Sequence, residues 1–213
     1  MKSWRGFLTA VLAAIGVLLA LTVGAAELKE SRDFRVINPP LAAPKDRIEV
    51  TEFFWYGCPH CFDFEPVLAA WARKLPADVT FRRVPTVTSS NKWTSAAQLY
   101  YTLEALDLLD KLHSDVFNAI HVDHQRLDDE QAVLDWVEKK GVDRKKFSEA
   151  WSSSGVQARI QQARELSRNS GLTGVPAVMV QGRYLALTAG NYEKLLGNIE
   201  QLIDRVRAEA GGK

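Results

Sequence analysis

Cysteine is scarce in this sequence, and neither sign of charge prevails. Two cysteines among 213 residues exclude the small secreted domains that several disulfides hold together. Two cysteines also cannot by themselves complete a four-ligand zinc site. Lysine and arginine number 27 against 26 aspartates and glutamates, a formal net charge of +1 that offers no basic field for a nucleic acid. The question is therefore what two cysteines three positions apart are for.

The first 26 residues have the pattern of an export signal. Lys2 and Arg5 precede an uncharged run over 7–23, and small residues follow, which is the order of a cleaved secretory signal. The alternative is an uncleaved membrane anchor, because seventeen apolar residues reach the lower limit for crossing a bilayer. Cleavage after Ala25 or Ala26 would leave 25 basic and 26 acidic residues, a net charge of −1. We therefore expect an oxidising compartment, where a close cysteine pair can persist as a disulfide.

The periodicity of the remaining chain predicts an α/β domain that a block of helices interrupts. Hydrophobic residues make up 46% of the sequence, and its length allows one domain with a sizeable insertion. Runs of β-branched and aromatic residues predict strands over 48–54 and 79–84, with a helix from Pro59 to about Leu75 between them. Helical patterns follow, and two strands and a helix end the chain. The expected divisions are a signal over 1–26, the first part of the α/β domain over 27–88, an inserted helical domain over 89–154 and the second part over 155–213.

Capping residues mark several helix ends. Asp128 is expected to cap a helix that ends at Gly141, and Asp143 to cap the next one, because aspartate accepts hydrogen bonds from first-turn amides. Strands over 177–180 and 183–187 flank Gln181-Gly182, a pair suited to a two-residue hairpin turn. Further helices are expected over 93–105, 109–122, 156–170 and 191–209.

The segment Cys58-Pro59-His60-Cys61 lies where a buried strand gives way to a helix. Pro59 suits the first helical position, which makes Cys58 the N-cap. The Cys58 sulfur then faces unpaired backbone amides and the positive end of the helix dipole, and both favour thiolate over thiol. His60 beside it favours the thiolate further. Because a stabilised reduced form weakens the disulfide, we expect the pair to act as an oxidant, with Cys61 as the buried resolving thiol.

Three other uses of the cysteine pair compete with redox catalysis. A c-type haem site would need histidine after the second cysteine, and Phe62 stands there. A zinc site would have to recruit His121 and His124 from the helical block, whereas a Cys-X-X-Cys motif at a strand–helix junction is a redox arrangement. A purely structural disulfide would close too small a loop to stabilise the fold much. Redox catalysis is the use that the pattern favours.

With its neighbours, the pair resembles the DsbA family of periplasmic thiol:disulfide oxidoreductases. The likeness rests on Glu-Phe-Phe-Trp-Tyr-Gly-Cys-Pro-His-Cys over 52–61 and Gly-Val-Pro-Ala over 174–177, and it covers essentially the whole mature chain. The Pro-His pair separates DsbA-like proteins from thioredoxins, which usually have Gly-Pro there. The resemblance implies a thioredoxin-like fold with an inserted all-helical domain and a redox-active Cys58–Cys61 disulfide.

The same resemblance implies how the site meets its partners. The family has a cis proline facing the cysteines, which corresponds to Pro176. The Val175 backbone would then pair with an extended client segment, a mode that needs little side-chain specificity. The resemblance also implies reoxidation by a DsbB-type quinone-linked membrane protein.

Glu52 is a carboxylate on an apolar strand face. Ile48, Val50 and Phe54 stand at every second position with Glu52, so the side chain of Glu52 points to the same strand face as theirs. Two interpretations are open: a strand face near water, or a buried carboxyl with a raised pKa that relays the proton of Cys61. The family has a glutamate at this spacing before the first cysteine, which favours the relay.

Arg83 raises a similar question on the neighbouring strand. It shares a face with Val79 and Phe81 and either partly neutralises Glu52 or stands exposed at a strand end. Relatives of DsbA often carry lysine near this position. Arginine departs from that pattern, and unlike lysine it cannot itself release a proton.

The sequence thus predicts an exported dithiol oxidase, a monomer without cofactor or metal that acts on unfolded or folding proteins with free cysteines. An isomerase or reductase is disfavoured because no N-terminal dimerisation domain precedes the fold. A non-enzymatic binding or metal-carrying thioredoxin-like module is the remaining alternative. We expect His113, His121 and His124 to be core or surface residues rather than catalytic ones, and some rings of 53–56 to border an apolar patch beside Cys58.

Overall fold

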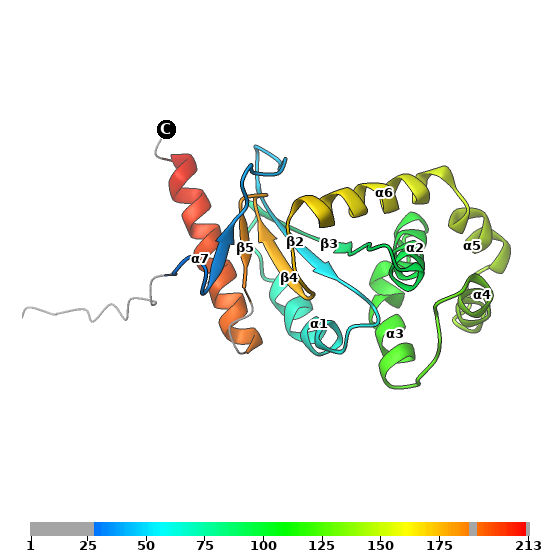
Figure 1. Ribbon diagram of the computed structural model, residues 1–213. Coiled ribbons are helices and arrows are strands. Elements are labelled where there is room, and N and C mark those ends of the chain that lie inside the picture. The colour runs from blue at the N-terminus through cyan, green and yellow to red at the C-terminus, as the bar shows by residue number, and fades with distance from the viewer. Residues whose placement is uncertain (1–27, 188–190, 212–213) are drawn as a thin grey trace, which may run out of the picture.

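A five-stranded mixed sheet organises the computed structural model, which describes residues 28–187 and 191–211 (Figure 1). Strands β2 and β3 run parallel, and the other neighbouring strands run antiparallel. The expected signal over 1–26 lies outside the described residues. In the spatial order β1-β5-β4-β2-β3, the strands are β1 (Phe34–Val36), β2 (Ile48–Phe54), β3 (Val79–Pro85), β4 (Ala177–Val180) and β5 (Tyr184–Ala186).

The first α/β unit consists of β2, helix α1 (Pro59–Ala72) and β3. Apolar side chains bury nearly all of β2 on both faces, as expected of a central strand in a parallel pair. The register sets Ile48 opposite Val79 and Glu52 opposite Arg83. Helix α1 continues through Pro66 without a break. The predicted strands over 48–54 and 177–180 and the parallel βαβ unit are confirmed.

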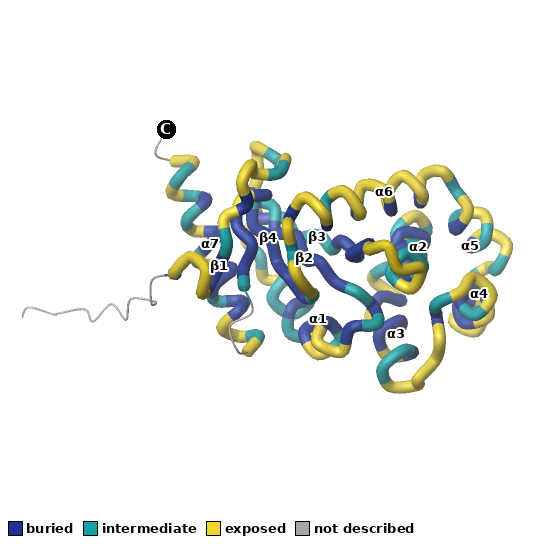
Figure 2. Tube along the Cα trace, viewed as in Figure 1, coloured by how far each residue is buried: buried dark blue, intermediate teal, exposed yellow. Residues whose placement is uncertain are grey.

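Helices α1 and α7 (Tyr192–Gly211) cover one face of the sheet (Figure 1). Buried residues follow the strands and the inward sides of these helices (Figure 2). Their apolar stripes are spaced as amphipathic helices require. This core includes Ile48, Val50, Phe64, Leu68, Val178, Leu195, Ile199 and Leu202.

The helical block lies beside the sheet and shares its second, larger core (Figure 1). It comprises α2 (Asn91–Ala105), α3 (Leu109–His121), α4 (Glu130–Lys139) and α5 (Arg144–Trp151), and the long helix α6 (Ser154–Asn169) leads back to the sheet. The predicted α/β fold with a helical insertion is confirmed, while the domain boundaries at 88 and 154 stay a prediction. No helix within the described residues is long and apolar enough to cross a membrane.

One helix cap differs from the expectation by a single residue. Asp129, and not Asp128, caps α4 by accepting from the Ala132 amide at 3.0 Å. Asp128 instead pairs with Arg126 at 2.9 Å, and this competing partner leaves the cap to its neighbour. The predicted cap of α5 by Asp143 is confirmed.

Phe117 of α3 joins the helical block to the sheet. It is 2% exposed, and its ring packs edge-on against Tyr56 with centroids 5.0 Å apart. We expect Phe117→Ala to lower the free energy of unfolding by about 3–5 kcal/mol, because the change leaves a cavity between the two parts. Denaturant unfolding measures this. Val122→Ala at the exposed end of the same helix is the control, with an expected change within about 0.5 kcal/mol. A loss below about 1 kcal/mol for Phe117→Ala would contradict the joint core.

Candidate active site

Cys58 stands at the junction of β2 and α1, as its place in the sequence predicts. It is the N-cap of α1, with extended backbone angles (φ −90°, ψ 118°), and Pro59 takes the first turn. The Cys58 amide donates to the Trp55 carbonyl at 2.9 Å and closes the turn that leaves the strand. Cys58 is 8% exposed, whereas Cys61 is fully buried, and both are free thiols in the structure. One sulfur is thus presented near the surface, with the other beneath it.

The two thiols differ strongly in acidity. The pKa of Cys58 falls from 9.0 to about 6, first through a hydrogen bond from the Cys61 thiol, which outweighs the opposing effect of burial. The amides of Cys61 and His60 and the charge of His60 lower it further. The pKa of Cys61 is raised, first because its proton is held by Cys58 and then because burial disfavours a thiolate. At neutral pH the negative charge therefore sits on Cys58 while Cys61 keeps its proton.

The loop before β4 faces this pair. The peptide bond between Val175 and Pro176 is cis, as the family resemblance implies. The Cys58 thiol donates to the Val175 carbonyl across a sulfur–oxygen distance of 3.4 Å. Once Cys58 loses its proton, this carbonyl is free to accept from another donor, such as the amide of an extended polypeptide.

The residues between the two cysteines, Pro59 and His60, are exposed. The His60 carbonyl accepts a hydrogen bond from the Tyr192 hydroxyl at 3.0 Å. This bond ties the first turn of α1 to α7 and leaves the imidazole of His60 at the surface beside Cys58.

Glu52 and Arg83 lie side by side on β2 and β3. Arg83 Nε is 3.2 Å from Glu52 Oε2, and Glu52 is 1% exposed. Burial raises the pKa of Glu52 to about 8, against the effect of Arg83, and the Glu65 carboxylate adds to the rise. The strand periodicity left open whether the two residues meet, and in the structure they do. A buried carboxyl that holds a proton near neutral pH is suited to acid–base work.

A second buried carboxylate, Glu65, shares the same arginine. Arg83 donates to both Glu65 oxygens, at 2.8 and 3.0 Å. Burial opposes the ionisation of Glu65, but His113 and Arg83 outweigh it, so its pKa lies below the ordinary value. Sequence reasoning missed this residue. The available signal was its spacing: Glu65 follows Cys61 by four residues, on the buried stripe of α1.

His113 of α3 completes the buried polar cluster. Its Nδ1 lies 2.8 Å from the Tyr56 hydroxyl, and its Nε2 lies 3.4 Å from Glu65 Oε2. Burial lowers the pKa of His113, with Glu65 opposing. A neutral His113 accepts from Tyr56 at Nδ1 and turns its Nε2 proton toward Glu65. The helical block thereby reaches the carboxylates beneath the cysteines.

The other two histidines of the helical block lie apart from any shared ligand set. His121 Nε2 is 2.8 Å from the Tyr56 carbonyl oxygen, and its ring stacks on Phe62 with centroids 4.9 Å apart. His124 is exposed and has a positive φ of 54°. Over residues 28–187 and 191–211, no group of three or more cysteine, histidine or acidic side chains is placed to hold a metal ion.

An aromatic pair borders the cysteines. Trp55 stacks on Trp93 of α2, with centroids 4.5 Å apart and planes within 9°. The backbone of Gly57 lies against the Trp55 ring so closely that any side chain at this position would collide with it. Trp55 and Gly57 line a pocket of 210 Å³, together with Ile120 and Leu127. An apolar surface therefore lies next to Cys58, as expected of a site that meets protein partners.

The sequence profile of the DSBA-like thioredoxin domain matches residues 49–200. The chain belongs to the DsbA family. It is 36% identical to the thiol:disulfide interchange protein DsbA of Burkholderia cepacia, over 94% of each chain. With DsbA of Bordetella pertussis the identity is 40%, over 92% of this chain and 94% of the relative. The crystal structure of Pseudomonas aeruginosa DsbA superposes with a TM-score of 0.81 at 36% identity, over 84% of this chain and 95% of that one.

Family membership makes the chain a thiol:disulfide oxidoreductase and confirms the thioredoxin-like fold with its helical insertion. As in the DsbA motif quoted above, Cys58 and Cys61 are separated by Pro59 and His60. Glu65 and His113 add to this DsbA-like site a buried cluster that the motif alone does not reveal.

The unequal thiols of this DsbA-family protein can be titrated directly. We expect the ultraviolet thiolate absorbance of the reduced protein to rise with a midpoint near pH 6, because the Cys61 thiol and nearby amides stabilise the Cys58 thiolate. Cys61→Ala removes the donor that contributes most, so its midpoint should move upward. A midpoint near 9.0 in the parent protein, or none of the expected upward movement in Cys61→Ala, would contradict this account.

Glu52→Gln tests the buried carboxyl. Glu52 ionises near pH 4.5 when unfolded and near pH 8 when folded, so the folded state holds an extra proton between these values and stability falls as pH rises through them. Glutamine does not titrate. The stability of the Glu52→Gln variant relative to the parent protein should therefore increase from pH 5 to pH 9, by on the order of 4 kcal/mol in total.

Denaturant unfolding of both oxidised proteins measures this difference, because Cys58 does not titrate in the disulfide. Glu49→Gln is the control, since Glu49 lies on the same strand and pairs with the partly exposed Arg82 at 2.9 Å. Its effect on stability should stay constant over this range. If the Glu52→Gln difference were equally constant, the carboxyl would not be the buried acid described above.

Proposed function

We propose that this DsbA-family protein is an exported dithiol oxidase that donates its Cys58–Cys61 disulfide to client proteins. One observation supports this most: at the end of β2 an acidic thiol, Cys58, lies near the surface above a buried thiol that keeps its proton. An acidic thiol forms a stable thiolate and leaves readily, which favours release of the client in its oxidised form.

The reaction has two exchanges. A client thiolate attacks the Cys58 sulfur, the Cys58–Cys61 bond breaks, and Cys61 leaves as a thiolate that takes up a proton. The second client thiolate then attacks the client's own sulfur in the mixed disulfide, and Cys58 leaves as a thiolate. Two electrons pass from the client to the protein, and one disulfide is exchanged for another.

The lowered pKa of Cys58 favours this direction. At pH 7 a fall from 9.0 to about 6 stabilises the reduced form by a factor of about ten, roughly 1.4 kcal/mol or about 30 mV for two electrons. Pro59 supports the effect by starting α1 directly after Cys58, and His60 by adding positive charge beside it. Both residues therefore act through the stability of the Cys58 thiolate.

Glu52 is the proposed proton donor to Cys61. When Cys61 leaves as a thiolate in a buried site, it needs a proton from a nearby group that is protonated near neutral pH. Glu52 has a pKa of about 8, and its charge is among the groups that raise the pKa of Cys61. Arg83, shared with Glu65, holds the Glu52 carboxyl in place and limits that rise.

The Val175–Pro176 loop is the proposed client-binding element. The Val175 carbonyl lies 3.4 Å from the Cys58 sulfur, so a client backbone paired there would have its own cysteine beside Cys58. Backbone pairing requires no particular client side chain. The clients are proteins with free cysteines, which unfolded or folding exported chains supply.

The export-signal pattern of residues 1–26 supports a periplasmic location. The resemblance to the DsbA family supports reoxidation by a DsbB-type quinone-linked membrane protein, because a donor that gives away its disulfide must regain one. We further propose that the protein acts as a monomer, with a first α/β part over 27–88, a helical domain over 89–154 and a second α/β part over 155–213.

Substitution of each cysteine separates the two exchanges. With Cys58→Ser, transfer of a disulfide to a reduced two-cysteine peptide should be abolished, because without Cys58 the protein has no disulfide to donate. With Cys61→Ser, the Cys58 thiolate should attack the disulfide of an oxidised two-cysteine peptide, release one peptide thiolate and stay joined to the other peptide sulfur, because no Cys61 thiol is left to break that bond. Mass spectrometry of the non-reduced mixture measures both. Undiminished transfer by Cys58→Ser would end the proposal, and efficient reshuffling of a scrambled substrate by the reduced parent protein would favour an isomerase.

A further inference from the structure

A polar pocket lies between the segment that follows β3 and the end of α6. Its volume is 640 Å³. Eight of its ten lining residues are polar, and none is acidic. Arginine guanidinium groups and hydroxyls such as those of Thr86, Thr88 and Ser167 supply hydrogen-bond donors. This composition suits an anionic ligand with oxygen acceptors.

Two arginines give the pocket its charge. Arg164 and Arg168 follow one another by one turn on the exposed side of α6. Arg164 donates to Gln161 at 3.1 Å, and neither arginine forms an ion pair with a carboxylate among the described residues. Arg159, on the same helix, is by contrast ion-paired with Glu104. The pocket therefore holds two guanidinium groups that an incoming carboxylate can engage in paired hydrogen bonds.

Two buried hydroxyls of the pocket lack partners. Thr86 is 3% exposed and Ser167 6%, and neither hydroxyl oxygen has a hydrogen-bond partner within the described part of the chain. A buried polar group without a partner is unfavourable unless a ligand satisfies it. The first turn of α2 lies at the same pocket through Asn91, and no side chain caps this helix and no acid stands in its first turn. Its unpaired amides add to the attraction for an anion.

The pocket adjoins the segment that leads to Val175, the residue whose carbonyl contacts Cys58. Leu172 lines it and precedes Val175, the proposed pairing residue, by three positions. The Thr86 amide donates to Phe54 at the end of β2, the same sheet edge from which the chain continues to Cys58. Three residues of chain reach at most about 10 Å, which limits the distance from Leu172 to Val175, and a client strand paired with Val175 covers that distance with about three residues.

We propose that this pocket is a carboxylate subsite for the client, engaging an aspartate or glutamate about two to four residues from the cysteine under attack. The inference rests on the proposed function, because it places the client backbone beside Val175. It adds to that function a preference among clients: those with an acidic residue at this distance are oxidised faster.

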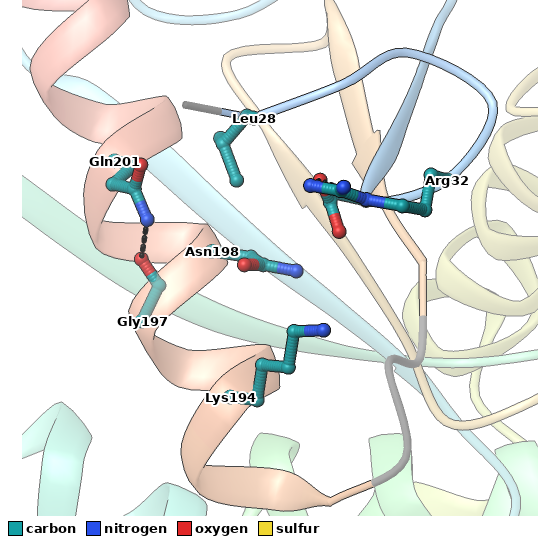
Figure 3. Close-up of a pocket in the computed structure, with 7 residues that line it drawn as sticks. Leu28, Arg32, Lys194, Gly197, Asn198 and Gln201 are labelled. Atoms are coloured by element: carbon teal, nitrogen blue, oxygen red, sulfur yellow. Dashed lines mark hydrogen bonds and ion pairs between the residues drawn. The ribbon is translucent and has the colours of Figure 1, made fainter. Parts of the chain in front are cut away.

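The pocket in Figure 3 provides a residue for a control variant that loses one positive charge. It has a volume of 370 Å³ and lies between the N-terminal segment and α7, where Arg32 and Lys194 reach toward the amide of Asn198. There Arg32 is ion-paired with Asp33. Helix α7 packs in the core on the other face of the sheet from the core that α6 joins. Removing the charge of Lys194 therefore changes the net charge of the protein without touching the proposed subsite.

The test compares reduced two-cysteine peptides that carry glutamate or glutamine two, three or four residues from one cysteine, on either side. Stopped-flow mixing with the oxidised full-length protein measures the second-order rate constant. We expect the best glutamate peptide to react about two- to fivefold faster than its glutamine counterpart, as for an exposed charge pair. In Arg164→Gln/Arg168→Gln this ratio should fall to about one. In Lys194→Gln it should be unchanged.

The outcomes separate this inference from the proposed function. If the glutamine peptides are not oxidised by the parent protein, the proposed function fails. If they are oxidised but glutamate gives no advantage, or the advantage survives in the double variant, only the subsite is overturned. Loss of the advantage in Lys194→Gln as well would assign the effect to overall charge and would also overturn it. If inorganic phosphate binds the arginines in calorimetry while glutamate peptides gain nothing, the pocket serves a free oxyanion instead.

Thr86→Val distinguishes a ligand-binding hydroxyl from a structural one. Because the Thr86 hydroxyl has no partner among residues 28–187 and 191–211, valine should leave stability unchanged or raise it. The advantage of the glutamate peptide should nevertheless decrease. A variant that loses stability while keeping the full advantage would show that the hydroxyl serves the fold and not the client.

Discussion

The parallel pairing of β2 with β3 is the constraint on which the rest of this protein depends. Its register sets Glu52 beside Arg83 inside the sheet, and four residues beyond its end the chain arrives at Cys58. Because β2 is buried on both faces, it cannot shift by one residue without moving a charged side chain into the opposite core. The buried acid and the Cys58 thiol near the surface therefore keep a constant relation to each other.

Electrostatically, the site shares one cation between two acids. Arg83 contacts both Glu65 and Glu52, and with Glu65 it forms the closer, paired contact. With Glu52 protonated, the buried trio is neutral, and with Glu52 ionised it carries one negative charge that burial penalises. Glu65 thus takes most of the neutralising power of Arg83, which leaves Glu52 as the group that holds a proton near neutral pH. A lysine would offer a single charged point, whereas the planar guanidinium can meet both carboxylates at once.

Local patterns and long-range packing contributed differently to what the sequence could predict. Strand β2 and the N-cap position of Cys58 follow from neighbouring residues, so pattern alone located both to the residue. The choice of Asp129 over Asp128 as a cap depends on a side-chain competition that helix periodicity does not contain. The contact between His113 and Glu65 and the pocket between α2 and α6 join segments distant in the chain. They arise only when the helices pack, and for that reason periodicity could not reveal them.

The two histidines of α3 hold Tyr56 at opposite ends, His113 at its hydroxyl and His121 at its carbonyl. Tyr56 stands two residues before Cys58, so these two hydrogen bonds fix the turn that carries Cys58 to the helical block. Any rotation of α3 against the sheet must break one of these bonds or carry the turn with it. The position of the Cys58 turn is therefore coupled to the packing of α3 through these two hydrogen bonds.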